Sequence, residues 1–231
     1  MGRGKEKIKR KHAQKRKEKA KRGKHVPFIL ANSPRKMIGI KNRYIYKSNM
    51  HNLIYKDGYF ENVKYQASII TDCNFKCCKL VGVDFYNTNL KRTSFKGALL
   101  KNVIFFNCNL KKTDFEDVKF ENVAFISTNI EVVNNLTQSD NIRIISQYPK
   151  INISEKFAII LRELANDENI YNSHVLHVNK GKWNQWNVKL LLDEYGIDLE
   201  RALIALTRRK NKREFITLYS YRRFIDSYLK K

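Results

Sequence analysis

Positively charged side chains are the residues of this chain best suited to chemistry, and that chemistry is the binding of phosphate groups. The chain has 231 residues and a formal net charge of +24. Residues 1–26 contain 13 Lys and Arg but only two acidic residues, the composition of an arm that follows a phosphate backbone. The candidate phosphate-binding residues of the arm are Arg3, Lys5, Lys7, Lys9, Arg10, Lys11, Lys15, Arg16 and Lys17. The alternative interpretation is a solubilising tail or a localisation signal.

A second basic cluster lies between two predicted helices near the C-terminus. Five of the six residues at positions 208–213 are charged, and this density at a corner between helices suits a phosphate backbone. The cluster consists of Arg208, Arg209, Lys210, Lys212 and Arg213. Arg222 and Arg223 extend it, while Tyr219 and Tyr221 could stack on bases. An ordinary exposed loop is the alternative.

Patterns typical of catalysis or metal binding are sparse. His174 and His177 are the only close pair of histidines, and no third ligand accompanies them. The sequence has no glycine-rich phosphate loop, no nucleophile elbow and no evident pair of carboxylates. We therefore expect a protein that is not an enzyme and that needs neither a metal ion nor a cofactor.

A repeat of five residues occupies the middle of the chain and must position these charges. Every fifth residue from 55 to 130 is large and apolar, and two positions before each of them, from residue 58 onward, the side chain is small. This period fits neither a helix nor a strand. It fits a chain that turns a corner every five residues and points one large and one small side chain inward. The large residues are Tyr55, Phe60, Tyr65, Ile70, Phe75, Leu80, Phe85, Leu90, Phe95, Leu100, Phe105, Leu110, Phe115, Phe120, Phe125 and Ile130.

The repeat resembles the pentapeptide-repeat family, whose consensus is Ala–Asp/Asn–Leu followed by two variable residues. Stretches such as Val-Asp-Phe at 83–85, Thr-Asn-Leu at 88–90 and Cys-Asn-Leu at 108–110 carry the resemblance. It implies a mainly β fold, a right-handed quadrilateral β-helix with twenty residues per coil, here followed by an α-helical C-terminal module. Stacked coils would place Tyr55, Phe75, Phe95 and Phe115 in one aromatic ladder, and Tyr65, Phe85, Phe105 and Phe125 in another.

The register of the repeat also assigns the four cysteines. Cys73, Cys78 and Cys108 fall on the small inward position, and only Cys77 points outward. A buried thiol acts as a compact apolar group, and neighbours that face opposite ways cannot share one metal ion. We expect structural cysteines and no zinc site.

Two outward faces of the predicted coils differ from the rest of the surface. One is a basic wall, for which a solvated face is the alternative to phosphate binding. Its members are Lys91, Arg92, Lys111 and Lys112 beside an asparagine ladder (Asn89, Asn109, Asn129), with Lys56, Lys76 and Lys96 on the next side. The other is an apolar stripe of Tyr86, Ile104, Phe106, Ala124 and Ile126, which needs a partner. The partner is either the chain itself, through the C-terminal helices or residues 27–50, or a second copy or another protein.

The flanks of the repeat suggest five regions. We predict a polybasic arm at 1–26 that is disordered alone and that could become helical on phosphate, a strand-rich cap at 27–54, the β-helix at 55–133, a linker at 134–152 and a helical module at 153–231. Ser154, Asn184 or Asn187, and Asp198 are predicted to begin helices. The last helix is expected from about Arg213 to Leu229.

The charge favours a nucleic-acid partner, RNA more than DNA, since a strongly basic chain needs a polyanion. The arm resembles those of ribosomal proteins, so we expect an RNA- or ribosome-associated binding protein with the β-helix as a rigid docking body. No hydrophobic run reaches the length of a transmembrane helix, and we expect a cytoplasmic protein without a membrane partner. The alternative is a module that binds a DNA topoisomerase or another DNA-bound enzyme. The resemblance suggests it, but the family's DNA mimicry needs an acidic rod and this one is basic.

Overall fold

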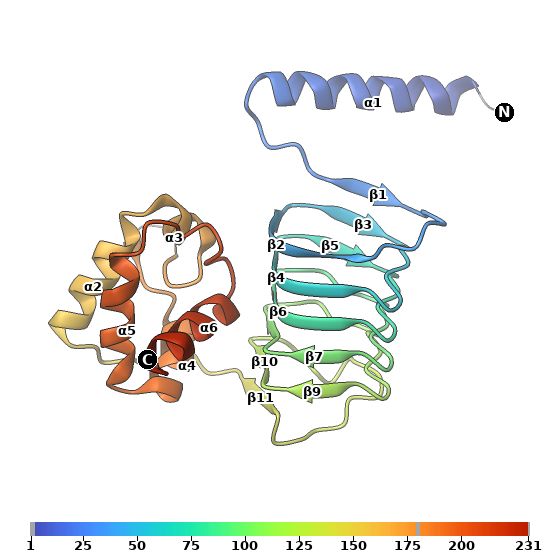
Figure 1. Cartoon of the computed structure of the whole chain (residues 1–231). Coiled ribbons are helices and arrows are strands. Elements are labelled where there is room, and N and C mark those ends of the chain that lie inside the picture. Colours follow the sequence, from blue (N-terminus) through green and yellow to red (C-terminus); the bar gives the residue numbers. More distant parts are fainter. Residues whose placement is uncertain (1–2, 179–180, 231) are drawn as a thin grey trace.

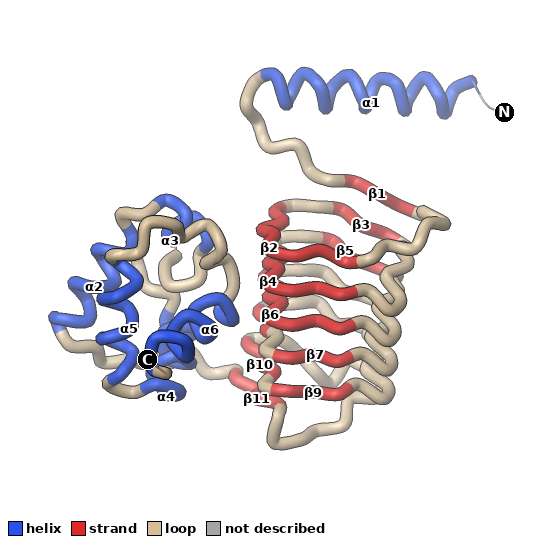
Figure 2. Tube along the Cα trace, in the orientation of Figure 1, coloured by secondary structure: helices blue, strands red, loops and turns tan. Residues whose placement is uncertain are grey.

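A computed structural model describes residues 3–178 and 181–230. The chain forms a β-helical rod, a helical module packed against one side of it, and an N-terminal helix that stands beyond the end of the rod (Figures 1 and 2). The strands are β1 (Ile29–Ala31), β2 (Gly39–Tyr46), β3 (Asn49–His51), β4 (Tyr59–Gln66), β5 (Ile69–Thr71), β6 (Lys79–Tyr86), β7 (Leu99–Lys101), β8 (Ile104–Phe106), β9 (Lys119–Glu121), β10 (Val123–Ile126) and β11 (Ile142–Ile145). The helices are α1 (Arg3–Lys21), α2 (Glu155–Ala165), α3 (Glu168–Ser173), α4 (Gln185–Tyr195), α5 (Asp198–Thr207) and α6 (Leu218–Leu229).

The rod is built by parallel pairing between residues twenty positions apart. Ile45 of β2 lies opposite Tyr65 of β4, which lies opposite Phe85 of β6. The coils make about six turns, so the predicted quadrilateral β-helix and the helical module after it are confirmed. The last pairing, between β10 and β11, has an offset of nineteen residues, since Phe125 faces Ile144.

Aromatic ladders fill the core as the period predicts. The rings of Phe85 and Phe105 stack with their centroids 5.2 Å apart, and Phe105 stacks on Phe125 at 4.9 Å. The second ladder repeats this along Phe75, Phe95 and Phe115 at 5.3 and 5.5 Å. Rings of the two ladders meet edge to face, in the arrangement that the aromatic quadrupole favours. The core is therefore packed by aromatic contact along and across the rod.

The corners of the coils need a left-handed backbone at every fifth residue. These corner positions hold mostly Asn, Asp and Gly, the residues that tolerate positive φ. Asparagines at neighbouring corners also bond to one another, as Asn62 Nδ2 donates to Asn42 Oδ1 at 2.8 Å and Asn122 donates to Asn102 at 2.8 Å. Residue choice at the corners thus lowers the strain of each turn and ties successive coils together.

The small inward residues link coils by hydrogen bonds. Thr93 Oγ1 donates to the carbonyl of Ile70 at 2.8 Å, and Cys78 Sγ donates to that of Tyr55 at 2.9 Å. Burial raises the pKa of the Cys78 and Cys108 thiols to about 12, and that of Cys73 to about 11. These three cysteines are therefore protonated packing residues, while Cys77 is exposed.

The ends of the rod differ in detail from the five predicted regions. Residues 27–54 contain β1, β2 and β3, which continue the stack in the same twenty-residue register. The linker segment contributes β11 to the last rung. The arm, for which the sequence predicts disorder in isolation, contains helix α1, since Lys, Arg, Ala and Gln are good helix formers.

Helices α2 and α4 begin at predicted capping residues, but Asp198 is the first residue of α5 and not its cap, because Ile197 holds the N-cap position without a side-chain bond. Ser154 Oγ accepts from the N–H of Phe157, and Asn184 caps α4. Helix α6 begins at Leu218 rather than near Arg213, because Thr217 forms a capping box with Ser220. Helix α3, capped by Asp167, was not anticipated from the sequence.

The ladder core predicts that the substitution Phe105→Ala lowers the free energy of unfolding by about 3–5 kcal/mol. Phe105 is fully buried and touches rings above, below and across the rod. The control is Phe28→Ala, because Phe28 is 50 % exposed. Urea unfolding of both variants measures the difference, and equal losses would contradict the ladder as the source of stability.

Candidate nucleic-acid interface

Helix α1 presents cations around its whole circumference. Its residues include eleven Lys and Arg and two Glu, and the side chains described from residue 10 onward are exposed, apart from His12, which is not described. Arg16 donates to the carbonyl of Pro27 at 3.0 Å, which ties the end of the helix to the chain that leads into the rod. The side chains of Arg3, Lys5, Lys7 and Lys9 lie outside the described part of the structure. The rest form a basic surface that has no apolar face to pack on another element.

The basic wall on the rod is partly neutralised. Arg92 forms a bidentate pair with Asp72, whose oxygens lie 2.5 and 2.6 Å away, and Lys96 pairs with Glu116 at 2.7 Å. Within the described residues Lys91, Lys111 and Lys112 have no ion pair. The asparagines beside them are occupied, because Asn89 and Asn109 accept from the N–H groups of Lys91 and Lys111. Lys56 and Lys76 on the next side are exposed and likewise have no ion pair among the described residues, so five lysines of the wall remain for a polyanion.

The basic corner at 208–213 divides into exposed and internal residues. Arg208, Lys210 and Arg213 are exposed. Lys212 is only 9 % exposed, and its Nζ donates to the carbonyl of Arg209 at 2.6 Å. Arg209 pairs with Glu214 at 2.5 Å. Two of the five predicted phosphate ligands, Arg209 and Lys212, therefore take part in contacts that hold the loop in shape, and phosphate binding by this corner stays a prediction.

The predicted extension of this corner faces inward. Arg222 is buried and donates to both oxygens of Glu194 at 2.7 Å, and Tyr221 is fully buried. Tyr219 packs on Gly82 of the rod. Arg223 is half-buried and pairs with Glu214 at 3.1 Å. The expectation that these residues meet nucleic acid is wrong for Tyr221 and Arg222, because α6 docks on the rod through this face.

The apolar stripe lies beneath the helical module. Ile104 and Ile126 are buried with residues of α2, α4, α5 and α6 in one core, and Phe106 packs against that core. Tyr86 Oη donates to Asn187 Oδ1 at 2.8 Å. The intramolecular partner is therefore the correct alternative, with the C-terminal helices rather than residues 27–50 covering the stripe. A homodimer or another protein would have to displace those helices to use it.

Two buried charges sit within this interface and face opposite helix ends. Lys64 Nζ donates to the carbonyl of Ser173 at the C-terminus of α3, at 2.7 Å. Asp84 Oδ2 accepts from the N–H of Leu218 at the N-terminus of α6, at 3.0 Å. A cation near a C-terminus and an anion near an N-terminus are the favourable pairings with the helix dipole. Burial raises the pKa of Asp84 to about 6 and lowers that of Lys64 to about 8, while their mutual attraction opposes both shifts.

One feature of the sequence, a glycine at position 82, indicates where the module docks on the rod. Corner positions 42, 62, 102 and 122 are all asparagine, but position 82 is glycine. A Cβ atom built at Gly82 would lie 2.1 Å from Cδ1 of Tyr219. The missing side chain thus leaves room for α6 to approach the backbone of the rod.

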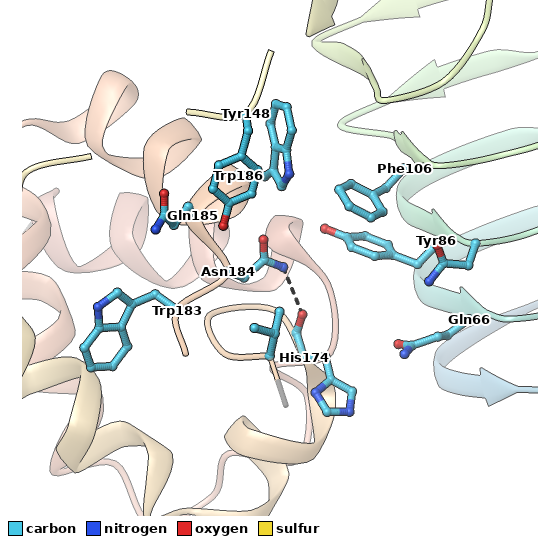
Figure 3. A pocket seen from close by; sticks show the side chains of 11 residues that line it. Gln66, Tyr86, Phe106, Tyr148, His174, Trp183, Asn184, Gln185 and Trp186 are labelled. Carbon is cyan, nitrogen blue, oxygen red and sulfur yellow. Dashed lines mark hydrogen bonds between the residues drawn. The ribbon is translucent and has the colours of Figure 1, made fainter. Parts of the chain in front are cut away.

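A pocket of about 260 Å³ opens where the rod meets the module (Figure 3). Tyr86, Phe106 and Gln66 point into it from the rod, and Asn184 and Trp186 border it from the module. Tyr148 is 62 % exposed and meets Trp186 edge to face at 5.5 Å. The pocket combines aromatic rings with amide groups.

His174 and His177, the two candidate metal ligands, have different structural roles. His177 is buried, and its Nε2 lies 2.8 Å from the carbonyl of Leu161, while His174 ends α3 in a left-handed conformation. Burial lowers the pKa of both imidazoles. In residues 3–178 and 181–230 no group of three His, Cys, Asp or Glu could hold a metal ion.

Comparison with known proteins agrees with the geometry of the rod. The family model described as "Pentapeptide repeat region" matches residues 68–137. The chain therefore contains a pentapeptide-repeat region in its rod. No curated protein matches it. None of the helices that the structure describes is both long and apolar enough to cross a membrane.

Two solved structures align with part of this chain. The pentapeptide-repeat protein Rfr23 from the cyanobacterium Cyanothece 51142 is 14 % identical, with 47 % of this chain and 86 % of that one covered and a TM-score of 0.23. Full-length QnrB1, a plasmid-mediated fluoroquinolone resistance protein, is 9 % identical, with 52 % and 92 % covered and a TM-score of 0.21.

Gly82→Asn is predicted to destabilise the contact between rod and module by about 1–3 kcal/mol, because its side chain would overlap Tyr219. The matched control is Gly97→Asn, since Gly97 also has a positive φ but its Cβ would meet only Cys77 Sγ, at 3.4 Å. Limited proteolysis of the connection at residues 146–153 measures how readily the module detaches from the rod. Equal cleavage of both variants would disprove the role assigned to Gly82.

The buried carboxyl group of Asp84 should make the free energy of unfolding depend on pH. Because the folded-state pKa of Asp84 is raised to about 6, the folded protein binds an extra proton between about pH 4 and pH 6. The free energy of unfolding that Asp84 contributes should therefore fall by up to about 3 kcal/mol as the pH rises through that window. Asp84→Asn should remove this component, as measured by urea unfolding from pH 4 to pH 7. Parallel profiles of the two proteins would refute it.

Proposed function

We propose that this chain is a non-enzymatic RNA-binding protein that associates with a large structured RNA, such as a ribosome or a pre-ribosome. The observation that carries the proposal is helix α1, which stands beyond the end of the rod, contains eleven Lys and Arg, and exposes each of its described side chains from residue 10 onward. A polybasic segment of this kind neutralises phosphates and releases their counterions. The rod and module supply a rigid body from which the arm extends.

The remaining exposed cations lie on the body itself. They include Lys111 and Lys112 on the rod and Arg208, Lys210 and Arg213 on the module, and Lys91 beside them is partly exposed. They are spread over separate faces, which suits the irregular surface of folded RNA better than one groove of a duplex. Phosphate contacts at several faces would position the body without reading sequence.

Reading of double-stranded DNA by a helix is the less favoured function. Helices α5 and α6 are joined by the basic corner, but Leu218, Tyr221 and Ile225 of α6 are buried against the rod and the module core. A recognition helix must place its face in the major groove, and α6 has that face covered.

Binding to a topoisomerase or another DNA-bound enzyme is the second class of function. It would use protein surface rather than phosphate contacts. The apolar stripe expected to serve it is covered by the module, and an acidic DNA-like rod is missing from a chain with a net charge of +24. RNA binding is therefore the function that the described residues support best.

The arm makes the proposal testable by salt dependence. In the full chain, replacing Lys11, Lys15 and Lys17 by Gln should weaken binding to single-stranded RNA of every sequence, and should lower the slope of log Kd against log salt by about 0.7 for each lost phosphate contact. Fluorescence anisotropy with labelled RNA at several salt concentrations measures both. The control is Lys→Gln at Lys41, Lys101 and Lys119, which are paired with Glu61 or Glu121.

Sedimentation of the native protein from lysate tests the larger partner. Co-migration with ribosomal particles that is lost after RNase treatment or at high salt is the expected result. If the purified chain shows no salt-sensitive affinity for RNA, and migrates as a small species in every condition, the proposal fails.

A further inference from the structure

The pocket between rod and module is a built feature of the interface. Its rod wall is one vertical row of outward side chains, Gln66, Tyr86 and Phe106, which the twenty-residue register places on successive coils. Tyr86 and Phe106 stack on each other at 4.8 Å, and Phe106 meets Trp186 edge to face at 6.3 Å. The position of each wall is thus fixed by the packing that holds the two bodies together.

The lining selects an uncharged, planar group with polar edges. Five aromatic side chains and five amide or imidazole side chains surround the space, and none of the lining residues that the structure describes is Asp, Glu, Lys or Arg. Both tryptophans of the chain, Trp183 and Trp186, are among the rings. The amides of Gln66, Asn87 and Gln185 can each donate and accept hydrogen bonds. Proteins bind an unpaired nucleobase by stacking aromatic rings on its face and by forming hydrogen bonds to its edges.

A second groove, of about 330 Å³, lies beside the pocket and supplies positive charge. Arg43 of β2 and Arg213 of the basic corner both line it, together with Glu168. Neither arginine has an ion pair in the described part of the chain. The two spaces adjoin, since Tyr44 of this groove donates to Gln66 of the pocket at 3.1 Å and Ser173 precedes His174.

We propose that this pair of spaces binds single-stranded RNA, with one unpaired base in the aromatic pocket and its phosphate beside Arg43 and Arg213. The inference rests on the proposed RNA-binding function and names the element of RNA that the body holds. The arm would provide affinity for any phosphate chain, whereas the pocket requires a base. Duplex RNA keeps its bases stacked and paired, so the pocket favours loops and single strands.

The two tryptophans make base binding directly visible. Titration of the full-length protein with a short single-stranded RNA should quench tryptophan fluorescence, because a base stacks against the rings. An abasic strand of the same length should bind, as anisotropy reports, but should leave the fluorescence unchanged. Quenching by the base-containing strand alone supports the pocket.

Two other outcomes separate this inference from the proposed function. If both strands bind with equal affinity and neither quenches, the pocket does not hold a base, although RNA binding stands. If neither strand binds, RNA binding itself fails and the pocket inference fails with it.

A variant of the exposed ring adds a second test. Tyr148→Ala keeps both tryptophans and removes a side chain that is 62 % exposed, so it should fold normally. It should weaken binding of the base-containing strand about tenfold and leave binding of the abasic strand unchanged. Phe28→Ala, an exposed aromatic outside both spaces, is the control and should change neither. Equal affinity of Tyr148→Ala and the native chain for the base-containing strand would overturn the stacking role.

Discussion

Every coil of the rod must return to the same lateral position after twenty residues, and the rest of the molecule depends on this constraint. The constraint sets which side chains point inward, so that rings meet rings from Tyr65 through Phe125. It equally sets which outward side chains lie above one another. The docking surface for the helical module consists of two such outward rows, one that contains Lys64 and Asp84 and one that contains Tyr86 and Phe106. Their members reach α3, α4 and α6 only because the register holds.

The interface between rod and module is unusual in combining an apolar stripe with buried ions. Transfer of Lys64 and Asp84 out of water costs free energy, and each recovers part of it from a helix terminus rather than from a close ion pair. Asp84 Oδ1 has no partner in the described residues. Such an arrangement stabilises one orientation of the module more than it stabilises binding in general, because both helix ends must arrive at their charges together.

The periodic part of the fold was predictable from sequence, and the aperiodic part was not. Sixteen apolar positions at a spacing of five determine the coil, the ladders and the inward cysteines, since each follows from the repeat alone. The position of the module could not be predicted, because it depends on Gly82, a single glycine in a row of asparagines, and on Lys64 and Asp84. In the sequence these two charged residues have the pattern of side chains that face solvent. The basic corner illustrates the same limit: its composition predicted five phosphate ligands, but whether a lysine such as Lys212 turns inward depends on the tertiary position of Asp167 and Arg209. The aromatic pocket draws on residues from positions 66 to 186, so no local pattern indicated it.

The twenty-residue coil also limits how the length of this protein can change during evolution. Gain of one whole coil on the α1 side of Asn42 would leave Arg43, Lys64, Asp84 and Tyr86 in place against the module, and would lengthen only the reach of the arm. An insertion of five residues between β4 and β6 would instead turn all later coils by a quarter of a revolution, and would carry Asp84 and Tyr86 to a face away from Lys64. The distance between the arm and the pocket can therefore grow in whole coils, while the segment from β2 to β8 must keep its length.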